Sequence, residues 1–175
     1  MKTLAKIILT LSFFMNSSTS FAARICDDFI TDEWPDYRYD INTADAVVID
    51  KKTTLMWKRC SEGLTGNNCE NGVATLHNWQ QALLLQDAAN AENFAGFNDW
   101  RLPNIEELRS IVALNCANPA INEVAFPNTP VYWFWSSSPI LQNDNFAWDI
   151  YFGKGNDTGN FRTVEFNVRL VRDSQ

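Results

Sequence analysis

Residues 99–112 read DWRLPNIEELRSIV, and this stretch decides the fold because it contains a full set of helix-start signals. Asn104 follows a proline and precedes Glu107 by three positions, which is the spacing of a capping box. In a capping box, each of the two side chains accepts a hydrogen bond from the other residue's backbone N–H. Apolar residues then recur at helical spacing, at Ile105, Leu108, Ile111 and Val112. The stretch therefore predicts a short amphipathic helix that begins after Pro103 and ends near Asn115.

Upstream of this stretch, the sequence predicts a β-hairpin and an earlier helix. The segments DAVVID and TTLMWKR, within residues 45–59, are rich in β-branched residues and are separated by a polar turn. Thr75 is placed to cap a helix that runs to about Asn90. Leu76 and Trp79 start its apolar stripe, since they and Leu83 are spaced for one helical face.

Downstream, apolar and polar residues alternate with a period of two, which is typical of strands. Three strands are predicted, at residues 132–138, 145–152 and 161–172. The segment GKGNDTGN, at residues 153–160, has the composition of a long turn that joins the last two strands. Two helices followed by an antiparallel sheet predict an α+β domain.

The N-terminal residues have the pattern of a secretory signal peptide. Lys2 and Lys6 precede an apolar run that is too short to span a bilayer, and Ser20-Phe21-Ala22 places small residues at a cleavage site. We expect residues 1–22 to be removed after Ala22. The protein is then exported to the periplasm, the cell surface or the medium, and is not an integral membrane protein.

The exported chain is expected to contain an acidic N-terminal arm, residues 23–44, and one domain, residues 45–173. Removal of the signal peptide changes the net charge from −7 to −9. This excess of acidic residues argues against nucleic acid, whose phosphates are bound by lysine and arginine. Between Cys26 and Asp50, Arg38 is the one basic residue among many carboxylates, and this segment is expected to form a solvated face.

Four cysteines remain after export, an even number that predicts a disulfide framework with three possible connectivities. Cys60 and Cys69 flank a loop rich in glycine and asparagine that can close on itself. That pairing leaves Cys26 to join Cys116, and we expect these two disulfides. A zinc site is the weaker alternative, because the sequence has no C-x-x-C motif and a single histidine.

Several segments together resemble the Lcl C-terminal domain family, which is named after a collagen-like bacterial adhesin. They are TTLMWKRC, the helix with Trp79, the block DWRLPNIEELRSIV, and the tail with FPNT, YWFWSSS, AWDIYF and VRLVR. The segments occur in the order of the family and cover nearly the whole exported chain. The residues that carry the motif in the central block are Trp100, Arg101, Leu102, Pro103, Asn104, Glu107 and Leu108.

The central block is also similar to the R-L-P segment of formylglycine-generating enzymes and other C-type-lectin-like domains. The resemblance implies a C-type-lectin-like fold, with two helices, a small twisted antiparallel sheet and a loop region that binds a ligand. The copper-binding cysteine pair of the enzymes is not expected here, because every cysteine is assigned to a disulfide. The family implies carbohydrate recognition in adhesion or aggregation. The Glu-Pro-Asn, Gln-Pro-Asp and Trp-Asn-Asp motifs of calcium-dependent lectins do not occur.

Aromatic residues of the strand at residues 132–138 are the first candidates for ligand binding. Trp133 and Trp135 lie on one face of this strand, and Tyr132 and Phe134 lie on the other. If the sheet has an open face, one of these pairs points toward solvent, where an aromatic ring can stack on a sugar.

Two turns rich in asparagine and aspartate are the second candidates. They are expected at Asn143-Asp144-Asn145 and at Asn156-Asp157-Thr158, at opposite ends of the same strand. Turn formation explains this composition. The weaker alternative is that the side-chain oxygens of these turns bind calcium. No other metal or cofactor is expected.

No catalytic residues are predicted, so we expect a protein that is not an enzyme. His77 lies beside Trp79 on a helix, and Ser136-Ser137-Ser138 lies in a strand without the flanking glycines of a hydrolase. Two hypotheses remain. The first is a surface-exposed domain that binds glycans, and the second is a module or accessory subunit that binds another exported or surface protein.

Overall fold

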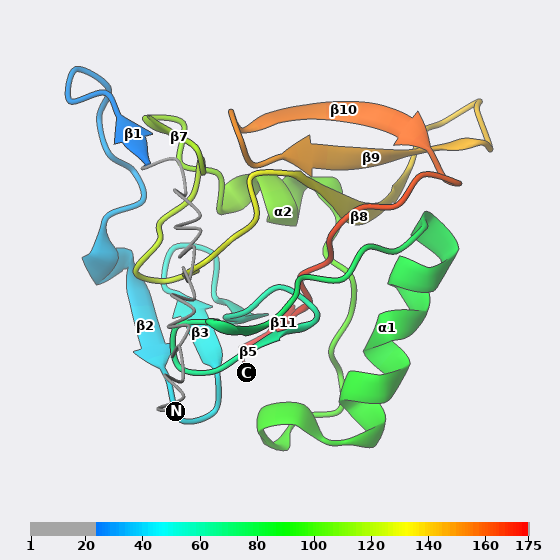
Figure 1. Cartoon of the computed structure of the whole chain (residues 1–175), viewed down its shortest axis with the longest axis horizontal. Coiled ribbons are helices and arrows are strands. Elements are labelled where there is room, and N and C mark those ends of the chain that lie inside the picture. Colours follow the sequence, from blue (N-terminus) through cyan, green and yellow to red (C-terminus); the bar gives the residue numbers. More distant parts are fainter. Residues whose placement is uncertain (1–23, 175) are drawn as a thin grey trace, which may run out of the picture.

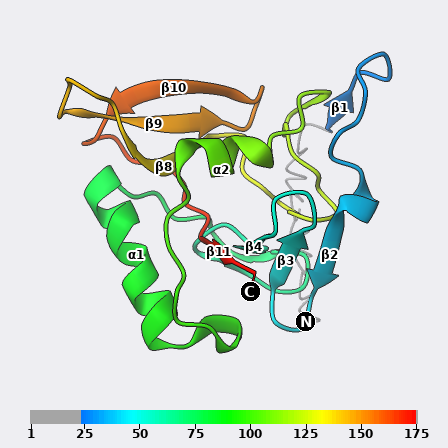
Figure 2. The same cartoon turned by 180° about the vertical axis from the view of Figure 1, so that it is seen from behind.

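The computed structural model describes residues 24–174, in which two antiparallel sheets lie on opposite sides of a short helix, α2 (Figures 1 and 2). The predicted signal peptide and its cleavage site lie outside the described residues. No helix among residues 24–174 has the length and apolar character needed to cross a membrane.

The helices are α1 (Trp79–Ala91) and α2 (Ile105–Ser110), with short 3-10 turns at Asp36–Arg38 and Phe94–Gly96. The four-stranded sheet has the order β11 (Val171–Asp173), β4 (Leu55–Lys58), β3 (Val47–Asp50), β2 (Tyr39–Asn42). The three-stranded sheet has the order β10 (Asn156–Phe161), β9 (Phe146–Tyr151), β8 (Trp133–Pro139). Two small pairs complete the fold: β1 (Ile25–Cys26) with β7 (Cys116–Ala117), and β5 (Leu64–Thr65) with β6 (Asn71–Gly72).

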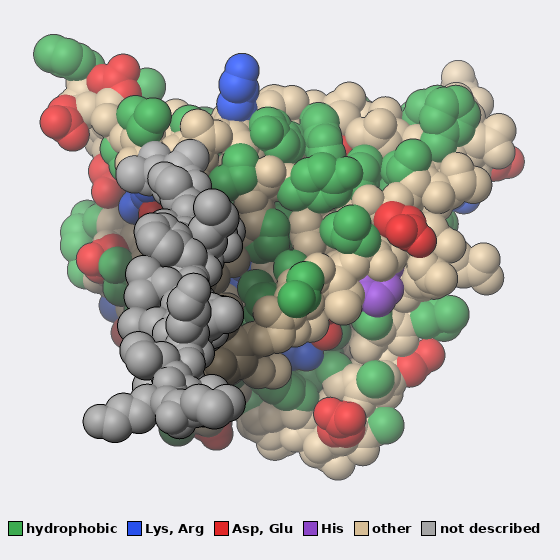
Figure 3. Space-filling model, viewed as in Figure 1, with side chains coloured by type: hydrophobic (Ala, Val, Ile, Leu, Met, Phe, Trp, Pro, Cys, Tyr) green, Lys and Arg blue, Asp and Glu red, His purple; other side chains and the backbone are tan. Residues whose placement is uncertain are grey.

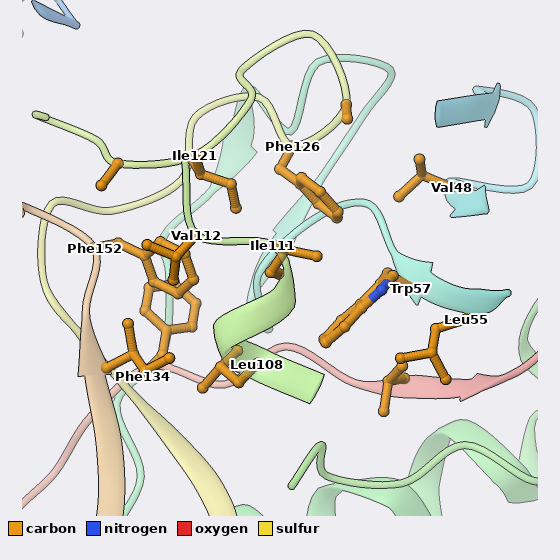
Figure 4. Packing of buried hydrophobic residues seen from close by; sticks show 14 of the residues in the cluster. Val48, Leu55, Trp57, Leu108, Ile111, Val112, Ile121, Phe126, Phe134 and Phe152 are labelled. Carbon is orange, nitrogen blue, oxygen red and sulfur yellow. The ribbon is translucent and has the colours of Figure 1, made fainter. Parts of the chain in front are cut away.

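The α+β class is confirmed, but the strands do not form the single small sheet that was expected. On one side of α2, the upstream hairpin of β3 and β4 pairs with β2 and β11. On the other side, β8, β9 and β10 form a separate sheet. The core joins the two sheets through α2. Figure 4 shows Leu108 of α2 and Ile111, the residue that follows the helix, between Phe134 and Phe152 on one side and Trp57 on the other.

The capping box at the start of α2 is confirmed. The Asn104 side chain accepts from the Glu107 N–H at 2.9 Å, and the Glu107 carboxylate accepts from the Asn104 N–H at 2.8 Å. The helix ends at Ser110 instead of near Asn115. Beyond it, the backbone N–H of Ala113 already pairs with the carbonyl of Ala120, and this turns the chain away from the helix axis.

The predicted start of the first helix is wrong by three residues. Asn78 caps α1 and forms a capping box with Gln81. Thr75 instead hydrogen-bonds the ring of His77, with Oγ1 and Nε2 2.8 Å apart. The backbone of His77 forms an antiparallel bridge with Phe166, so this position is held extended and the helix begins after it.

The predicted long turn at residues 153–160 is also wrong, because most of it forms strand β10. A tight turn ends at Gly155, whose φ of +79° favours glycine, and pairing with β9 begins at Asn156. Gly159 is needed within the strand because a Cβ there would meet Ile140. The strand predicted at 161–172 is wrong at its start, because Phe161 ends β10 and residues 162–164 form a turn. The rest pairs only in part, as isolated bridges and β11.

Both expected disulfides are confirmed, Cys26–Cys116 and Cys60–Cys69. The first joins β1 to β7 and so ties the N-terminal arm to the chain that follows α2. The second closes the loop that contains β5 and β6. No cysteine of the described chain is free.

The N-terminal arm is not only a solvated acidic face. Trp34 is buried and donates from its indole N–H to the carbonyl of Ser110, at the end of α2, at 2.8 Å. Arg38 and Asp50 form a buried bidentate ion pair, with the closest atoms 2.5 Å apart. Burial raises the pKa of Asp50, but hydrogen bonds from Arg38 and Thr53 outweigh it and leave the pKa below its ordinary value.

Candidate functional site

One face of the three-stranded sheet combines aromatic and hydrogen-bonding side chains in adjacent rows. The strand register places Asn156, Tyr151 and Trp133 side by side across β10, β9 and β8. The next row on the same face is Thr158, Asp149 and Trp135. Figure 3 shows a group of hydrophobic side chains on the part of the surface that this sheet forms. We call this surface, with Asn160 at its β10 end, the row face.

The aromatic half of the row face is a continuous strip of rings. The rings of Trp133 and Tyr151 have centroids 4.8 Å apart, and Trp133 stacks on Phe166 at 5.9 Å. Tyr132 meets the edge of Phe166 and is itself exposed. The Tyr151 ring lies against Gly153, where any larger residue would displace it. Trp133 and Tyr151 are both partly exposed, so solvent reaches the strip at these two rings.

The row face also contains a buried carboxylate, Asp149, which is fully inaccessible to solvent. Its Oδ2 accepts from the side-chain amide of Asn160 at 3.0 Å, and its Oδ1 has no hydrogen-bond partner among the described residues. Burial, together with the negative charge of nearby Asp157, raises the pKa of Asp149 to about 7, although the Asn160 hydrogen bond opposes this shift.

Replacement of this carboxylate is expected to change how stability depends on pH. Because the pKa of Asp149 is higher in the folded state than in the unfolded state, stability is lost as the pH rises from about 4 to about 7. Asp149→Asn removes this loss. We expect it to raise the free energy of unfolding at pH 8 by about 2 kcal/mol more than at pH 5, measured by urea denaturation at both values.

The control for this measurement is Asp87→Asn, because Asp87 is an exposed carboxylate on α1. It should change stability by less than about 0.5 kcal/mol at either pH. An equal effect of Asp149→Asn at pH 5 and pH 8 would contradict the raised pKa of Asp149.

The two tryptophans predicted as ligand contacts have different environments. Trp133 belongs to the exposed strip, whereas Trp135 is fully buried and donates from its indole N–H to the carbonyl of His77 at 2.9 Å. Phe134, on the other face of β8, is fully buried as well. The expectation of an open sheet face is therefore wrong at the centre of β8, because α1 covers one side and α2 covers the other.

The two predicted asparagine and aspartate turns are not equivalent. Residues Asn143, Asp144 and Asn145 do form the exposed turn between β8 and β9, where the Asn143 side chain accepts from the Asn145 N–H at 3.3 Å. Asn156 and Asp157 instead lie in β10 and point to opposite faces of it. Asp157 accepts from Arg109 of α2 at 2.7 Å, so this side chain joins the sheet to the helix.

The central motif positions α2 against the four-stranded sheet. Trp100 is buried and donates to the carbonyl of Phe94 at 3.0 Å. The guanidinium of Arg101 binds both carboxylate oxygens of Glu107, at 2.7 and 2.8 Å. Arg101 also forms a backbone bridge with Val171 of β11. Leu102, Pro103 and Leu108 are buried around this junction, so the motif is structural in this fold.

Sequence reasoning missed three residues of the row face, Asp149, Tyr151 and Asn160, and placed Thr158 in a turn instead of a strand. The segment AWDIYF did contain a signal, since Asp149 interrupts an otherwise apolar strand and a buried carboxylate is rare. Thr158 and Asn160 gave none, because their segment has the composition of a turn.

Two other kinds of binding site, an anion site and a metal site, have little support among the described residues. A shallow hollow beside Tyr37 is lined by Arg38, Lys51 and Lys52, but all three cations already pair with carboxylates. No cluster of three or more histidine, cysteine, aspartate or glutamate side chains suited to a metal occurs within residues 24–174.

A family model, the Lcl C-terminal domain, matches residues 46–172. The matched span begins directly before β3 and includes both helices and all of the three-stranded sheet. The arm that carries Trp34 and Arg38 lies outside it. Comparison with curated proteins gives no match.

Proposed function

Because the chain belongs to the Lcl C-terminal domain family, we propose that it is a non-enzymatic glycan-binding domain that acts outside the cytoplasm in attachment or aggregation. The two disulfides and the adhesin-related family fit an extracytoplasmic protein. The proposal rests on the family together with one observation, the row face.

The row face supports glycan binding through its mixture of groups. Trp133 and Tyr151 present partly exposed rings, and Asn156, Thr158 and Asn160 present amide and hydroxyl groups beside them. Sites for small molecules combine apolar rings with a few polar groups that fix orientation. A sugar has both an apolar C–H face and hydroxyl groups that donate and accept hydrogen bonds, so it complements this mixture.

A protein partner is the second candidate, and a different surface favours it. At the far end of the three-stranded sheet, Leu141 is 86% exposed and Phe161 is 56% exposed, and the Phe161 ring packs on Phe146 at 4.2 Å. Exposed apolar groups of this kind are typical of protein contacts. Phe146 and Phe161 lie on the sheet face opposite the row face.

The test is a glycan array probed with the purified domain, once with calcium and once with a chelator. We expect saturable binding to a defined glycan class that persists in the chelator, because the row face binds through rings, amides and a hydroxyl. Loss of binding on chelation would place a cation at the Asn143–Asn145 turn instead. Absence of binding in both conditions, with the domain folded, would refute the glycan proposal and favour a protein partner.

A further inference from the structure

We propose that the ligand of the row face is an uncharged sugar, with its C–H face on Trp133 and Tyr151 and its hydroxyl groups on the β10 side chains. This inference rests on the proposed function and adds the place and the chemical class of the ligand. It follows from the size of the row, the fixed orientation of one amide, and the distribution of cations.

The dimensions of the first row fit one sugar ring and its substituents. Asn156, Tyr151 and Trp133 stand on three adjacent strands, so the row spans about 10 Å from β10 to β8. The rings occupy the β8 and β9 positions, and the amide of Asn156 occupies the β10 position. A pyranose over the rings therefore has its equatorial hydroxyls at the level of β10, where Asn156 is exposed.

The amide of Asn160 is held in a defined orientation by a buried group. Its Nδ2 donates to Oδ2 of Asp149, which is fully buried, so its Oδ1 is turned away from that carboxylate. The remaining N–H and the Oδ1 are then available to a ligand as one donor and one acceptor. A sugar hydroxyl needs such a pair, since it donates and accepts at once. Thr158, between Asn156 and Asn160 on the same face, adds a hydroxyl.

The charges of the described residues favour an uncharged ligand over a sulfated or carboxylated one. The rows themselves contain the carboxylate of Asp149 and neither lysine nor arginine. Elsewhere, seven cations that could attract an anion are already in ion pairs: Arg38, Lys51, Lys52, Lys58, Arg101, Arg109 and Arg172. Two cations near the sheet form no ion pair among the described residues: Lys154, in the turn before β10, and Arg162, whose guanidinium lies over the ring of Trp79. With a net charge of −7 for the whole chain, a polyanionic glycan meets repulsion over most of the surface.

The experiment uses an array that carries uncharged oligosaccharides of hexoses and N-acetylhexosamines, each beside a sulfated form with the same backbone. The best binder is then titrated against the wild type and two variants, Tyr151→Leu and Asn156→Ala. Loss of an aromatic stacking partner should weaken binding about tenfold or more, and loss of the Asn156 amide should weaken it about three- to tenfold. Circular dichroism and thermal melting establish that each variant is folded.

The matched control is Phe161→Leu, which removes an exposed aromatic ring from the opposite face of the same sheet. Its affinity should stay within about twofold of the wild type. If a glycan binds but Tyr151→Leu and Asn156→Ala retain full affinity, the assigned place is wrong while the glycan-binding function stands. Preference for the sulfated forms would show that the assigned ligand class is wrong, while the glycan-binding function stands. Absence of any glycan binding overturns both proposals.

Discussion

Arg169→Met is expected to lower the free energy of unfolding by about 3–5 kcal/mol. Arg169 is almost fully buried, and its guanidinium donates to the carbonyls of Lys58 and Arg59 and to the hydroxyls of Ser61 and Thr129. Methionine keeps much of the apolar stem but donates no hydrogen bond, so four buried acceptors lose a partner. Urea denaturation at pH 7 measures the loss.

The expected loss is a net value, because the buried cation is itself costly. No carboxylate of the described chain forms an ion pair with Arg169, and burial lowers its pKa to about 9, which still leaves it charged at neutral pH. Besides the hydrogen bonds, the charged form is favoured by the negative charge of nearby Glu62 and by the ring of Phe126, 4.8 Å away. Adding Ser61→Ala to Arg169→Met should recover part of the loss, since it removes one unpaired acceptor. A loss below about 1 kcal/mol would mean that the cost of burying the charge cancels its hydrogen bonds.

Asp50→Asn is expected to lower the free energy of unfolding by about 3 kcal/mol at pH 7. The change leaves the buried guanidinium of Arg38 without its counter-charge, although its bonds to the carbonyls of Glu33 and Ser110 remain. Because the pKa of Asp50 is lowered in the folded state, its contribution is present above about pH 4 and is lost as the pH falls further. The difference between the wild type and the variant should therefore shrink in acid.

The matched control is Asp40→Asn, which breaks the exposed ion pair between Asp40 and Lys51. Exposed pairs contribute about 0–1 kcal/mol, so this variant should remain close to the wild type. Equal effects of Asp40→Asn and Asp50→Asn would contradict the role of burial. The comparison uses chemical denaturation at pH 7 and at about pH 3, where part of the Asp50 contribution is lost.

The features that the sequence predicted well depend on neighbouring residues. The Asn104 and Glu107 capping box is a local pattern, and the structure reproduces it atom by atom. The disulfide between Cys60 and Cys69 could also be predicted, because a short loop separates the two residues. The start of α1 was not, because Thr75 and Asn78 are both good caps, and the choice between them depends on the distant bridge between His77 and Phe166.

The features that the sequence missed depend on pairing between distant segments. Strand β10 has asparagine, aspartate and glycine at positions that favour a turn, and it is a strand because β9 pairs with it in register. The row face could not be predicted for the same reason, since its rows exist only once that register is fixed. Arg101 is a different case, because its partner Glu107 lies six residues away and was assigned to capping alone.

The N-terminal arm has a consequence for the order in which the chain can assemble. Cys26 meets its partner 90 residues later, and Trp34 is held by Ser110 and by Asn122, whose amide donates to its carbonyl. Cys60 and Cys69, by contrast, are nine residues apart. A chain that emerges with its N-terminus first therefore closes the small loop while the arm is still unattached. The thiol of Cys26 must then wait until nearly two thirds of the chain has appeared, so its disulfide to Cys116 can form only after both helices have emerged.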